Sequence, residues 1–499
     1  MTAQRLTLHN TDTWSIGRLS VVKETRRAVP ATPFRVLDAP QLRDDYYCSV
    51  LAYSYTSRTL AVGLNNRVYL WSEMFGVRYP PTFPGRSNAY ITSLSFSSTQ
   101  GGYSILAIGR ADGQVALWSL FDEDSRFESQ QPSAVACLAF KPGTTRRPSE
   151  RLATTVDTED LLVGDELGNV HYYSVEWTSD HQSAIHGWNG AMTLIARISV
   201  HTQQICGLAW SPDGGSFATG GNDNVCCLFE VVDILGQPEP VNTQAAFQAL
   251  LAGFEVHGHT HNWRPYHTIA GLLGRQSHEV VQDHPATADG VTVTHTRAVP
   301  GRGRVRDITE GCQKHRWAHS AAVKAIAFCP WQRGLIATGG GSNDRAIHFY
   351  HCSSGACLAT IDVAAQVTSL IWSTTRREIV ATFGYAQPEH SFRIAVFTWP
   401  ECRQVVAIPW AGEMRALYAI PYPGGPNEAS KHRGEGGTWW SRTAEEGCIV
   451  VASSDESVKF HEVWSETRKS TCGTKGLLGG SDILESLEGV DKEGSEVIR

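Results

Sequence analysis

Long apolar runs are missing from this sequence. No stretch approaches the roughly 18 apolar residues of a membrane span, and the first residues, MTAQRLTLHNTDTW, lack the apolar core of a secretory signal. An excess of basic charge is also missing: the formal net charge is -7, so no overall positive field attracts the chain to nucleic acid or to a membrane. We therefore expect neither a membrane nor nucleic acid among its partners.

Paired cysteines are missing as well. The 12 cysteines are scattered and none forms a C-x-x-C pair. Several fall in segments with the apolar pattern of strands: Cys206, Cys226, Cys227, Cys329 and Cys448. We interpret them as small buried apolar residues in a reducing compartment, and we expect a location in nucleus and cytoplasm.

The sequence carries no fingerprint of reaction chemistry. It has no G-x-S-x-G, P-loop, H-E-x-x-H or Rossmann motif in a supporting context. His201 and His319 precede the first strand of their units, and Asp223 and Asp344 sit in the turn before the third. Because such a pair more often fixes a turn than forms a catalytic dyad, we predict that the protein is not an enzyme and has no cofactor.

What the sequence does have is one strand-rich unit repeated about seven times. The clearest copies are CGLAWSPDGGSFATGGNDNVCCLFEV (206–231) and VKAIAFCPWQRGLIATGGGSNDRAIHFYHC (323–352). Each has alternating apolar residues, a turn, a strand ending in Thr-Gly-Gly, a turn containing Asp and a third strand. This pattern is typical of a WD-repeat β-propeller blade.

An aromatic or histidine residue marks the end of the third strand in each unit. These positions are Trp71, Trp118, Tyr173, Phe229, Tyr350, Phe397 and His461. The gap between Phe229 and Tyr350 is far wider than the ~40–45 residues of one blade, which indicates a large insertion. We therefore predict an all-β, seven-bladed WD-repeat propeller with a long loop insertion between blades 4 and 5.

The same spacing suggests the domain boundaries. We expect an N-terminal arm over 1–32, the propeller over 33–464 with an insertion at about 236–312, and a flexible C-terminal tail over 465–499. The segment PFRVLDAP (33–40) precedes the first unit. It can supply a strand to the last blade, which would close the ring and remove an exposed sheet edge.

The insertion is rich in histidine, glycine and threonine. His257, His259 and His261 form an H-x-H-x-H pattern that could ligate a metal ion. Nothing nearby supplies the cysteine or carboxylate context of a firm site, so we favour a mobile, solvated loop and expect no metal.

Several strings together point to one family. VPATPFRVLDAPQLRDDYY (29–47), LAVGLNNRVYLWS (60–72) and the unit AAVKAIAFCPWQRGLIATGGGSNDRAIHFYHCSSGACLATID (321–362) resemble the Fizzy and Fizzy-related proteins, as does the Ile498-Arg499 ending. These proteins are coactivators of the anaphase-promoting complex, a ubiquitin ligase. The resemblance implies a non-catalytic adaptor that recruits degron-bearing substrates, such as cyclins and securin, for mitotic or meiotic proteolysis. It also implies checkpoint or pseudosubstrate inhibitors among the partners.

The resemblance assigns a first degron site. In this family the destruction box, with its key Arg, lies in the groove between the first and last blades. The matching positions here are Asp45 in DDYY and Glu456 in SSDES. Two carboxylates can hold a guanidinium by charge-assisted hydrogen bonds.

A second site for the Lys-Glu-Asn degron is implied on the central top face. The matching positions are Asn222, Asn224, Ser342, Gln366 and Arg415. Among them Arg415 offers the fixed positive charge for the degron Glu, and the amides can read its Asn.

One position departs from the family. Where relatives often read Val-Asp-Trp-Ser, this chain reads LAYS, so Ala52 stands in place of an acid that could meet the degron Lys. We expect weakened binding of that degron and a modest gain from Ala52→Asp.

Docking to the complex is implied at the C-terminus. Ile498 and Arg499 would bind a helical-repeat subunit, with the preceding polar residues as a tether. The family's second anchor, a C-box of approximately Asp-Arg-Tyr/Phe-Ile-Pro, has no match in 1–29. The alternatives left open are a general WD-repeat scaffold and a C-box-lacking, non-activating competitor of the same complex.

Overall fold

The computed structural model describes residues 4–7, 27, 29–78, 88–152, 154–236, 296–297, 299–300, 305–385, 390–425 and 447–464. The chain divides into two compact units, one formed by 1–234 with 296–499 and the other by 235–295. The second unit lies outside the described residues except for Leu235 and Gly236.

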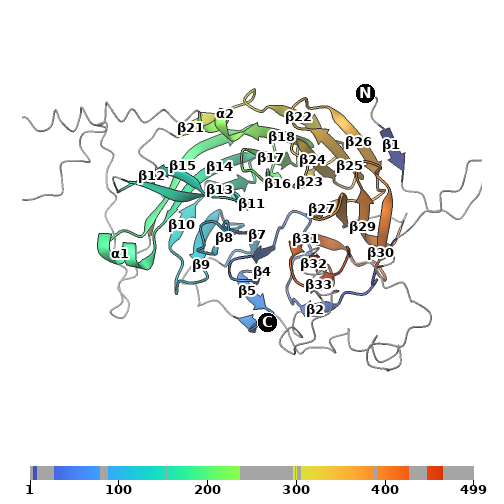
Figure 1. The fold of residues 1–499 in the computed structure, drawn as a ribbon, viewed down its shortest axis with the longest axis horizontal. Helices are drawn as coiled ribbons and strands as arrows, with labels where there is room; N and C mark the ends of the chain where they lie inside the picture. The colour runs from blue at the N-terminus through green and yellow to red at the C-terminus, as the bar shows by residue number, and fades with distance from the viewer. Residues whose placement is uncertain are drawn as a thin grey trace, which may run out of the picture. The chain divides into compact units, whose positions relative to one another are not determined.

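The first unit is a propeller of seven antiparallel sheets, as the repeats predict (Figure 1). Blade 1 contains β3–β6 (Leu51–Ser54, Thr59–Leu64, Arg67–Ser72, Gly76–Arg78), and blade 2 contains β7–β10 (Ile91–Phe96, Ile105–Arg110, Gln114–Ser119, Phe127–Gln130). Blade 3 contains β11 and β13–β15 (Val135–Phe140, Thr155–Asp165, Asn169–Trp177, Gly190–Ser199). Blade 4 contains β16–β18 with β22 (Ile205–Trp210, Ser216–Gly221, Val225–Glu230, His315–Ala318). Blades 5 to 7 contain β23–β26 (Val323–Phe328, Leu335–Gly340, Ala346–His351, Cys357–Asp362), β27–β30 (Val367–Trp372, Glu378–Phe383, Phe392–Thr398, Gln404–Pro409), and β31–β33 with β2 (Ala416–Tyr422, Cys448–Ser453, Ser457–His461, Arg35–Asp38).

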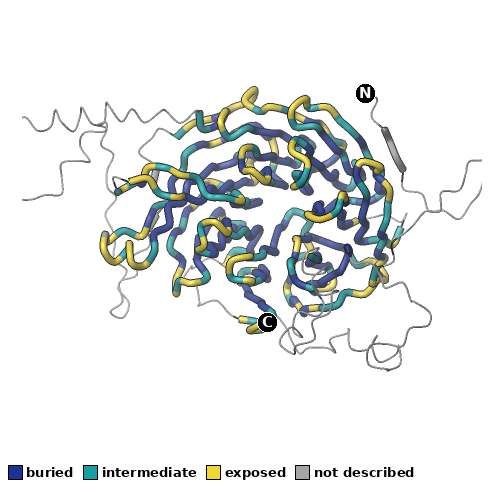
Figure 2. The backbone as a smooth tube through the Cα atoms, in the orientation of Figure 1, coloured by how far each residue is buried: buried dark blue, intermediate teal, exposed yellow. Residues whose placement is uncertain are grey.

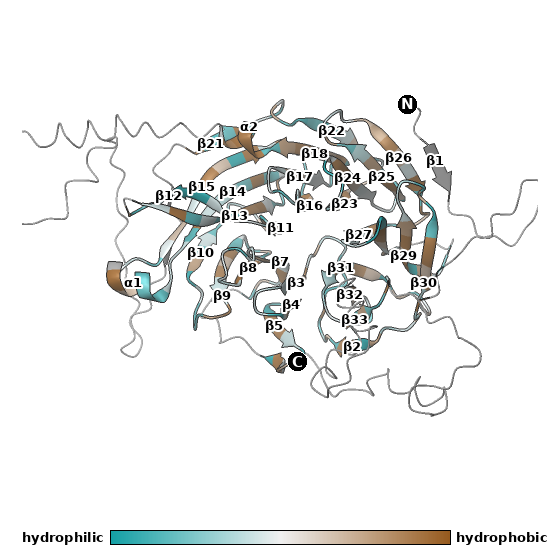
Figure 3. Ribbon diagram, viewed as in Figure 1, coloured by the Kyte–Doolittle hydropathy of each residue, from teal (hydrophilic) through white to brown (hydrophobic). Residues whose placement is uncertain are grey.

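Alternating apolar residues explain why these segments form strands, whose side chains pack against the neighbouring blades. The second and third strands are almost wholly buried, while exposed residues gather in the loops (Figure 2). Hydrophobic residues, drawn in brown, occur in many of the strands of the ring (Figure 3). All seven predicted markers lie in the third strand of a blade: Trp71, Trp118, Tyr173, Phe229, Tyr350, Phe397 and His461.

The predicted ring closure is confirmed. Strand β2 pairs antiparallel with β33, with Arg35 opposite Phe460 and Asp38 opposite Ser457. Leu37 of β2 is 0% exposed in a cluster that joins blades 7 and 1, whereas Val36 points outward and is 44% exposed. The N-terminal segment thus supplies the outer strand of the last blade.

The position of the insertion differs from the prediction. It lies within blade 4, between β18 and the fourth strand β22, and not between blades 4 and 5. The helix α2 (Val231–Leu235) follows β18, and β21 (Arg306–Ile308) runs parallel to β15 of blade 3. The fourth strand was missed because only Trp317 of its four residues is buried, so it carries no apolar alternation.

Blade 3 carries further elements. The strand β12 (Thr145–Pro148) pairs with the long β13, and α1 (Asp180–His186) is capped by a Ser179–Gln182 capping box.

Short strands β1 (Gln4–Thr7), β19 (Thr296–Arg297) and β20 (Val299–Pro300) add parallel to β26, β10 and β15. Among the described residues, no helix has the length and apolarity to cross a bilayer.

The predicted turn-fixing pairs are confirmed in blade 4. His201 Nδ1 lies 3.0 Å from Asp223 Oδ1, and its Nε2 lies 2.7 Å from Thr219 Oγ1. In blade 5 the carboxylate of Asp344 instead contacts His348 Nε2 at 2.9 Å and accepts from the Ser320 amide at 3.0 Å. The prediction of a His319–Asp344 pair is therefore wrong, because the histidine bound to Asp344 is His348 of the third strand.

The two blade 5 histidines differ in charge. Burial lowers the pKa of His348, but the interactions with Asp344 and Cys357 together outweigh burial and raise that pKa to about 9. Burial and the neighbouring His348 lower the pKa of His319 to about 4, although Asp344 opposes that shift. At neutral pH, His348 is the charged partner of Asp344.

The closing strand β2 predicts that two neighbouring residues, Leu37 and Val36, contribute differently to the free energy of unfolding. Leu37→Ala should lower the free energy of unfolding by about 2–5 kcal/mol, because it leaves a cavity at the seam between blades 7 and 1. Val36→Ala on the same strand should change it by less than about 0.5 kcal/mol. Denaturant unfolding of both variants measures the contrast, and equal losses would contradict closure through Leu37.

The His348–Asp344 pair predicts a pH dependence. The folded pKa of His348 lies above its ordinary 6.5, so its contribution is fully present below that pH and is lost as pH rises through about 9. Relative to wild type, His348→Gln should cost about 2 kcal/mol at about pH 6 and much less at about pH 10. Denaturant unfolding at both pH values tests this, with His351→Gln on the same strand as control. A constant cost across pH would contradict a charged pair.

Candidate functional site

The strand order puts two kinds of loop on one face of the propeller. In each blade the chain reaches this face between the second and third strands, and again when it crosses to the first strand of the next blade. We call this the top face. Seven turns and the blade-to-blade crossovers therefore present their side chains together.

All predicted degron residues lie on the top face. The crossovers carry Asp45, Gln366 and Arg415, and the turns before the third strands carry Asn222, Asn224, Ser342 and Glu456. Positions far apart in the sequence are thereby brought to one surface.

The segment Asp44–Cys48 connects several of these positions. It belongs to the crossover from blade 7 to blade 1, and we call it the crossover segment. Asp44 forms an ion pair with Arg415 of the blade 6 to blade 7 crossover. The Tyr47 hydroxyl donates to Asn222 Oδ1 at 2.9 Å, and the Tyr46 hydroxyl lies 3.5 Å from the Ala322 carbonyl. The segment thus contacts blades 4, 5 and 7.

The two predicted destruction-box acids border the same crossover. Asp45 Oδ1 accepts from the Tyr47 amide at 2.9 Å, and its other oxygen lies 3.7 Å from the Arg43 guanidinium. Its side chain is 27% exposed. Glu456 is exposed, with a φ of 57°, and its carboxylate accepts from the Gln41 amide at 3.2 Å. Both carboxylates keep access to solvent while hydrogen bonds restrain them.

The other predicted residues differ in their surroundings. Asn222 also donates from Nδ2 to Gln203 Oε1 at 2.9 Å. Gln366 Oε1 accepts from the Tyr385 amide at 3.2 Å. Asn224 has a left-handed φ of 64° and Ser342 is half-buried; their main-chain carbonyls accept hydrogen bonds inside blades. Of these residues, Asn222 and Arg415 contact the crossover segment directly.

The expectation for Ala52 is not supported. Ala52 is 6% exposed and belongs to an apolar cluster with Ala61, Leu70 and Ile91 between blades 1 and 2. A carboxylate at this position would enter that cluster and lose hydration. The expected gain from Ala52→Asp is therefore withdrawn, because the new carboxylate would be buried among apolar side chains.

Sequence reasoning missed two polar residues of this face. Asp44 and Tyr47 make the contacts described above, although only Asp45 of the DDYY string was singled out. The available signal was the run of charged and aromatic residues between two apolar strands. Their partners come from blades 7 and 4, and sequence order does not show such contacts.

Other predictions fall outside the described residues. Ile498 and Arg499 do, and so do the histidines of the H-x-H-x-H pattern. In the part of the chain that the structure describes, no group of three or more His, Cys, Asp or Glu side chains could hold a metal ion. Every cysteine in that part is a free thiol.

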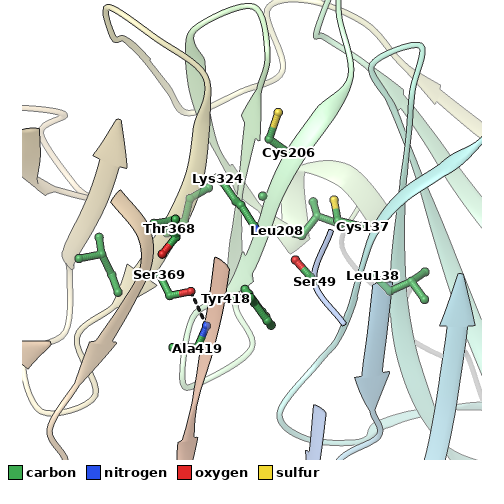
Figure 4. A pocket seen from close by; sticks show the side chains of 14 residues that line it. Ser49, Cys137, Leu138, Cys206, Leu208, Lys324, Thr368, Ser369, Tyr418 and Ala419 are labelled. Carbon is green, nitrogen blue, oxygen red and sulfur yellow. Dashed lines mark hydrogen bonds between the residues drawn. The ribbon is translucent and has the colours of Figure 1, made fainter. Parts of the chain in front are cut away.

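The inner strands of the blades surround a central channel (Figure 4). A cavity of about 90 Å³ there is lined by residues of blades 3 to 7, together with Ser49 ahead of blade 1. Lys324 of β23 is the charged side chain among its lining residues. Lys324 connects this cavity to the crossover segment, because its ammonium donates to the Cys48 carbonyl at 2.9 Å.

A ring of seven blades, each built on four strands, defines a seven-bladed β-propeller. The WD domain, G-beta repeat family matches residues 192–230, which cover the last strand of blade 3 and the first three of blade 4. A chain in a crystal structure of the mitotic checkpoint complex aligns with a TM-score of 0.55 and 24% identity, covering 91% of this chain and 100% of that one. This likeness supports the fold.

Sequence relatives give the family. The meiotic fizzy-related protein 2 of Schizosaccharomyces pombe is 30% identical over 475 residues, which cover 93% of this chain and 70% of that protein. An uncharacterized WD repeat-containing protein of the same yeast is 31% identical over 473 residues, 94% of this chain and 67% of that protein. The meiosis-specific APC/C activator protein AMA1 of Saccharomyces cerevisiae is 25% identical, covering 96% and 66%. The chain belongs to the Fizzy and Fizzy-related family of WD-repeat proteins.

Family membership also bears on catalysis. Relatives named as anaphase-promoting complex subunits cdc20 and cdh1 in Dictyostelium discoideum are 26% identical over 90% and 82% of this chain, which spans 64% and 43% of those proteins. The family consists of non-catalytic WD-repeat adaptors, so the prediction that the chain is not an enzyme is confirmed.

Proposed function

We propose that this protein is a substrate-recognition coactivator of the anaphase-promoting complex, acting in the nucleus and cytoplasm. Its top face would bind destruction-box and Lys-Glu-Asn degrons, and Ile498-Arg499 would dock to a helical-repeat subunit. The observation that carries the proposal is the placement of two accessible carboxylates, Asp45 and Glu456, along the crossover between the last and first blades.

The electrostatics of this crossover favour a guanidinium. Asp45 already lies near Arg43, whose own guanidinium sits 3.6 Å from the centre of the Tyr90 ring. The Arg43–Asp45 contact is partly exposed and therefore weak. An incoming arginine can replace Arg43 as the partner of Asp45 at a small cost in free energy, and Glu456 can provide a second acceptor for its guanidinium.

At the proposed Lys-Glu-Asn site, the ligand would replace an acid of the protein rather than a base. Arg415 is paired with Asp44, and both side chains are partly exposed. A degron Glu must compete with Asp44 for the guanidinium, while Asn222 and Gln366 present amide groups nearby on the same face. The site therefore works by replacing one carboxylate with another.

Removing the two acids tests the first site. Asp45→Ala combined with Glu456→Ala should weaken a destruction-box peptide about tenfold or more, because its Arg loses two charge-assisted hydrogen bonds. Fluorescence anisotropy with a labelled peptide measures the change. Glu401→Ala, which removes an exposed acid from the β29–β30 hairpin, is the control and should leave the affinity unchanged.

A second peptide makes this test specific. A destruction-box peptide that lacks its Arg should bind wild type and the double variant equally weakly. Equal losses for both peptides would show that the two acids act through folding, and the proposed role of the pair would be wrong.

Releasing Arg415 tests the second site. Asp44→Asn should strengthen binding of a Lys-Glu-Asn peptide by about two- to fivefold, because the degron Glu no longer competes with Asp44. The gain should shrink in high salt, since the pairs involved are partly exposed. Calorimetry at two salt concentrations measures both effects.

The matched control is a peptide with Gln in place of the degron Glu. It should bind wild type and Asp44→Asn alike. Weaker binding of the normal peptide to Asp44→Asn would instead mean that Asp44 holds Arg415 in its binding position.

A further inference from the structure

A lysine lies inside the central channel of the propeller. Lys324 belongs to β23, the innermost strand of blade 5, and is 5% exposed (Figure 4). Its neighbours in the strand are apolar, in the string VKAIAF. Burying a cation is costly unless its donors are satisfied, so the contacts of this side chain need an explanation.

The Lys324 ammonium has three donors, and three main-chain carbonyls accept from it. It contacts the Tyr46 carbonyl at short range, the Cys48 carbonyl at 2.9 Å and the Leu417 carbonyl at 3.3 Å. The first two belong to the crossover segment and the third to β31 of blade 7. One cation of blade 5 therefore ties together the two blades at the ring's seam.

Aromatic rings complete its surroundings. The ammonium lies 5.3 Å from the centre of the Tyr46 ring and 5.0 Å from that of Tyr418. These distances are within the range of cation–π attraction. Burial lowers the pKa of Lys324 to about 8, while Cys48 and Asp45 oppose that shift. The side chain is therefore mainly charged at neutral pH.

The crossover segment depends on such contacts because it forms no strand over Asp44–Cys48. Two of its carbonyls, on either side of Tyr47, are bound by Lys324. Fixing these carbonyls restrains the backbone that carries Asp45 and Tyr47. Those two side chains are a proposed destruction-box acid and the partner of Asn222.

We propose that Lys324 is a positioning residue for the top face: from below, it holds the crossover segment and so sets the places of Asp45 and Tyr47. It would influence both degron sites without touching a degron. This inference rests on the proposed function, but its structural part can be measured without any ligand.

The test compares Lys324→Met with Lys141→Met in the full-length chain. Lys141 of blade 3 is also largely buried, and its ammonium contacts Thr145 and Asp160 far along the ring from the crossover segment. Hydrogen exchange of peptides covering 44–48 is measured first. Exchange should rise about tenfold or more in Lys324→Met and stay at the wild-type level in Lys141→Met.

Peptide binding is measured next. Lys324→Met should weaken a destruction-box peptide about tenfold and also weaken a Lys-Glu-Asn peptide, with Lys141→Met near wild type. In an Asp45→Ala background, Lys324→Met should add much less to the loss for the destruction box. That non-additivity distinguishes positioning of Asp45 from general destabilisation.

The outcomes separate the two proposals. If wild type binds neither peptide, the proposed function is wrong, but faster exchange confined to 44–48 in Lys324→Met would still support the positioning role. Unchanged hydrogen exchange at 44–48 in a folded Lys324→Met protein would overturn the positioning role. If Lys324→Met does not fold, Lys324→Gln is used, whose shorter neutral side chain should loosen the segment in the same way; wild-type exchange and binding in that variant would overturn the proposal.

Discussion

Closure of the ring is the constraint on which the rest of this structure depends. Seven sheets arranged in sequence leave a seam, and the seam is joined by residues from opposite ends of the propeller, Arg35–Asp38 and Ser457–His461. The hydrophobic cluster at the seam spans blades 7 and 1. Because the crossover segment follows soon after β2, the pairing that closes the ring also anchors the chain just ahead of Asp45. Stability and the candidate site therefore share one stretch of chain.

Both arginines that lie beside the crossover segment are paired with carboxylates of the protein itself. Arg43 lies beside Asp45, and Arg415 is bound to Asp44. A ligand must exchange these partners, so each exchange yields only the difference between two similar ion pairs. Such a face suits short peptides of modest affinity, for which several weak contacts in one chain add through effective concentration. A rigid ring is a good support for this, because the turns need not move to meet the ligand.

The sequence was most informative where local pattern and burial coincide. Alternating apolar residues, the Thr-Gly-Gly strand ends and the aromatic markers predicted the seven blades, and PFRVLDAP predicted the closing strand. The insertion was misplaced because β22 exposes half its residues and carries no alternation. The partner of Asp344 was missed because two histidines compete for it, and only packing selects His348. Ala52 was read as a surface position although strands around it bury it.

The candidate site shows a related limit. Residues such as Asn222 and Ser342 lie in turns that each blade fixes with its own hydrogen bonds, so a repeat pattern is enough to locate them. The crossovers have no such local rule; the Asp44–Cys48 segment takes its position from Arg415, Asn222 and Lys324, which come from three other blades. This segment therefore links the two proposed degron sites, and a second link runs from Arg415 to Ser454, in the turn that carries Glu456. A lysine within an apolar inner strand was the one sign of that connection in the sequence, because a cation is kept in such a place only where carbonyls can receive it.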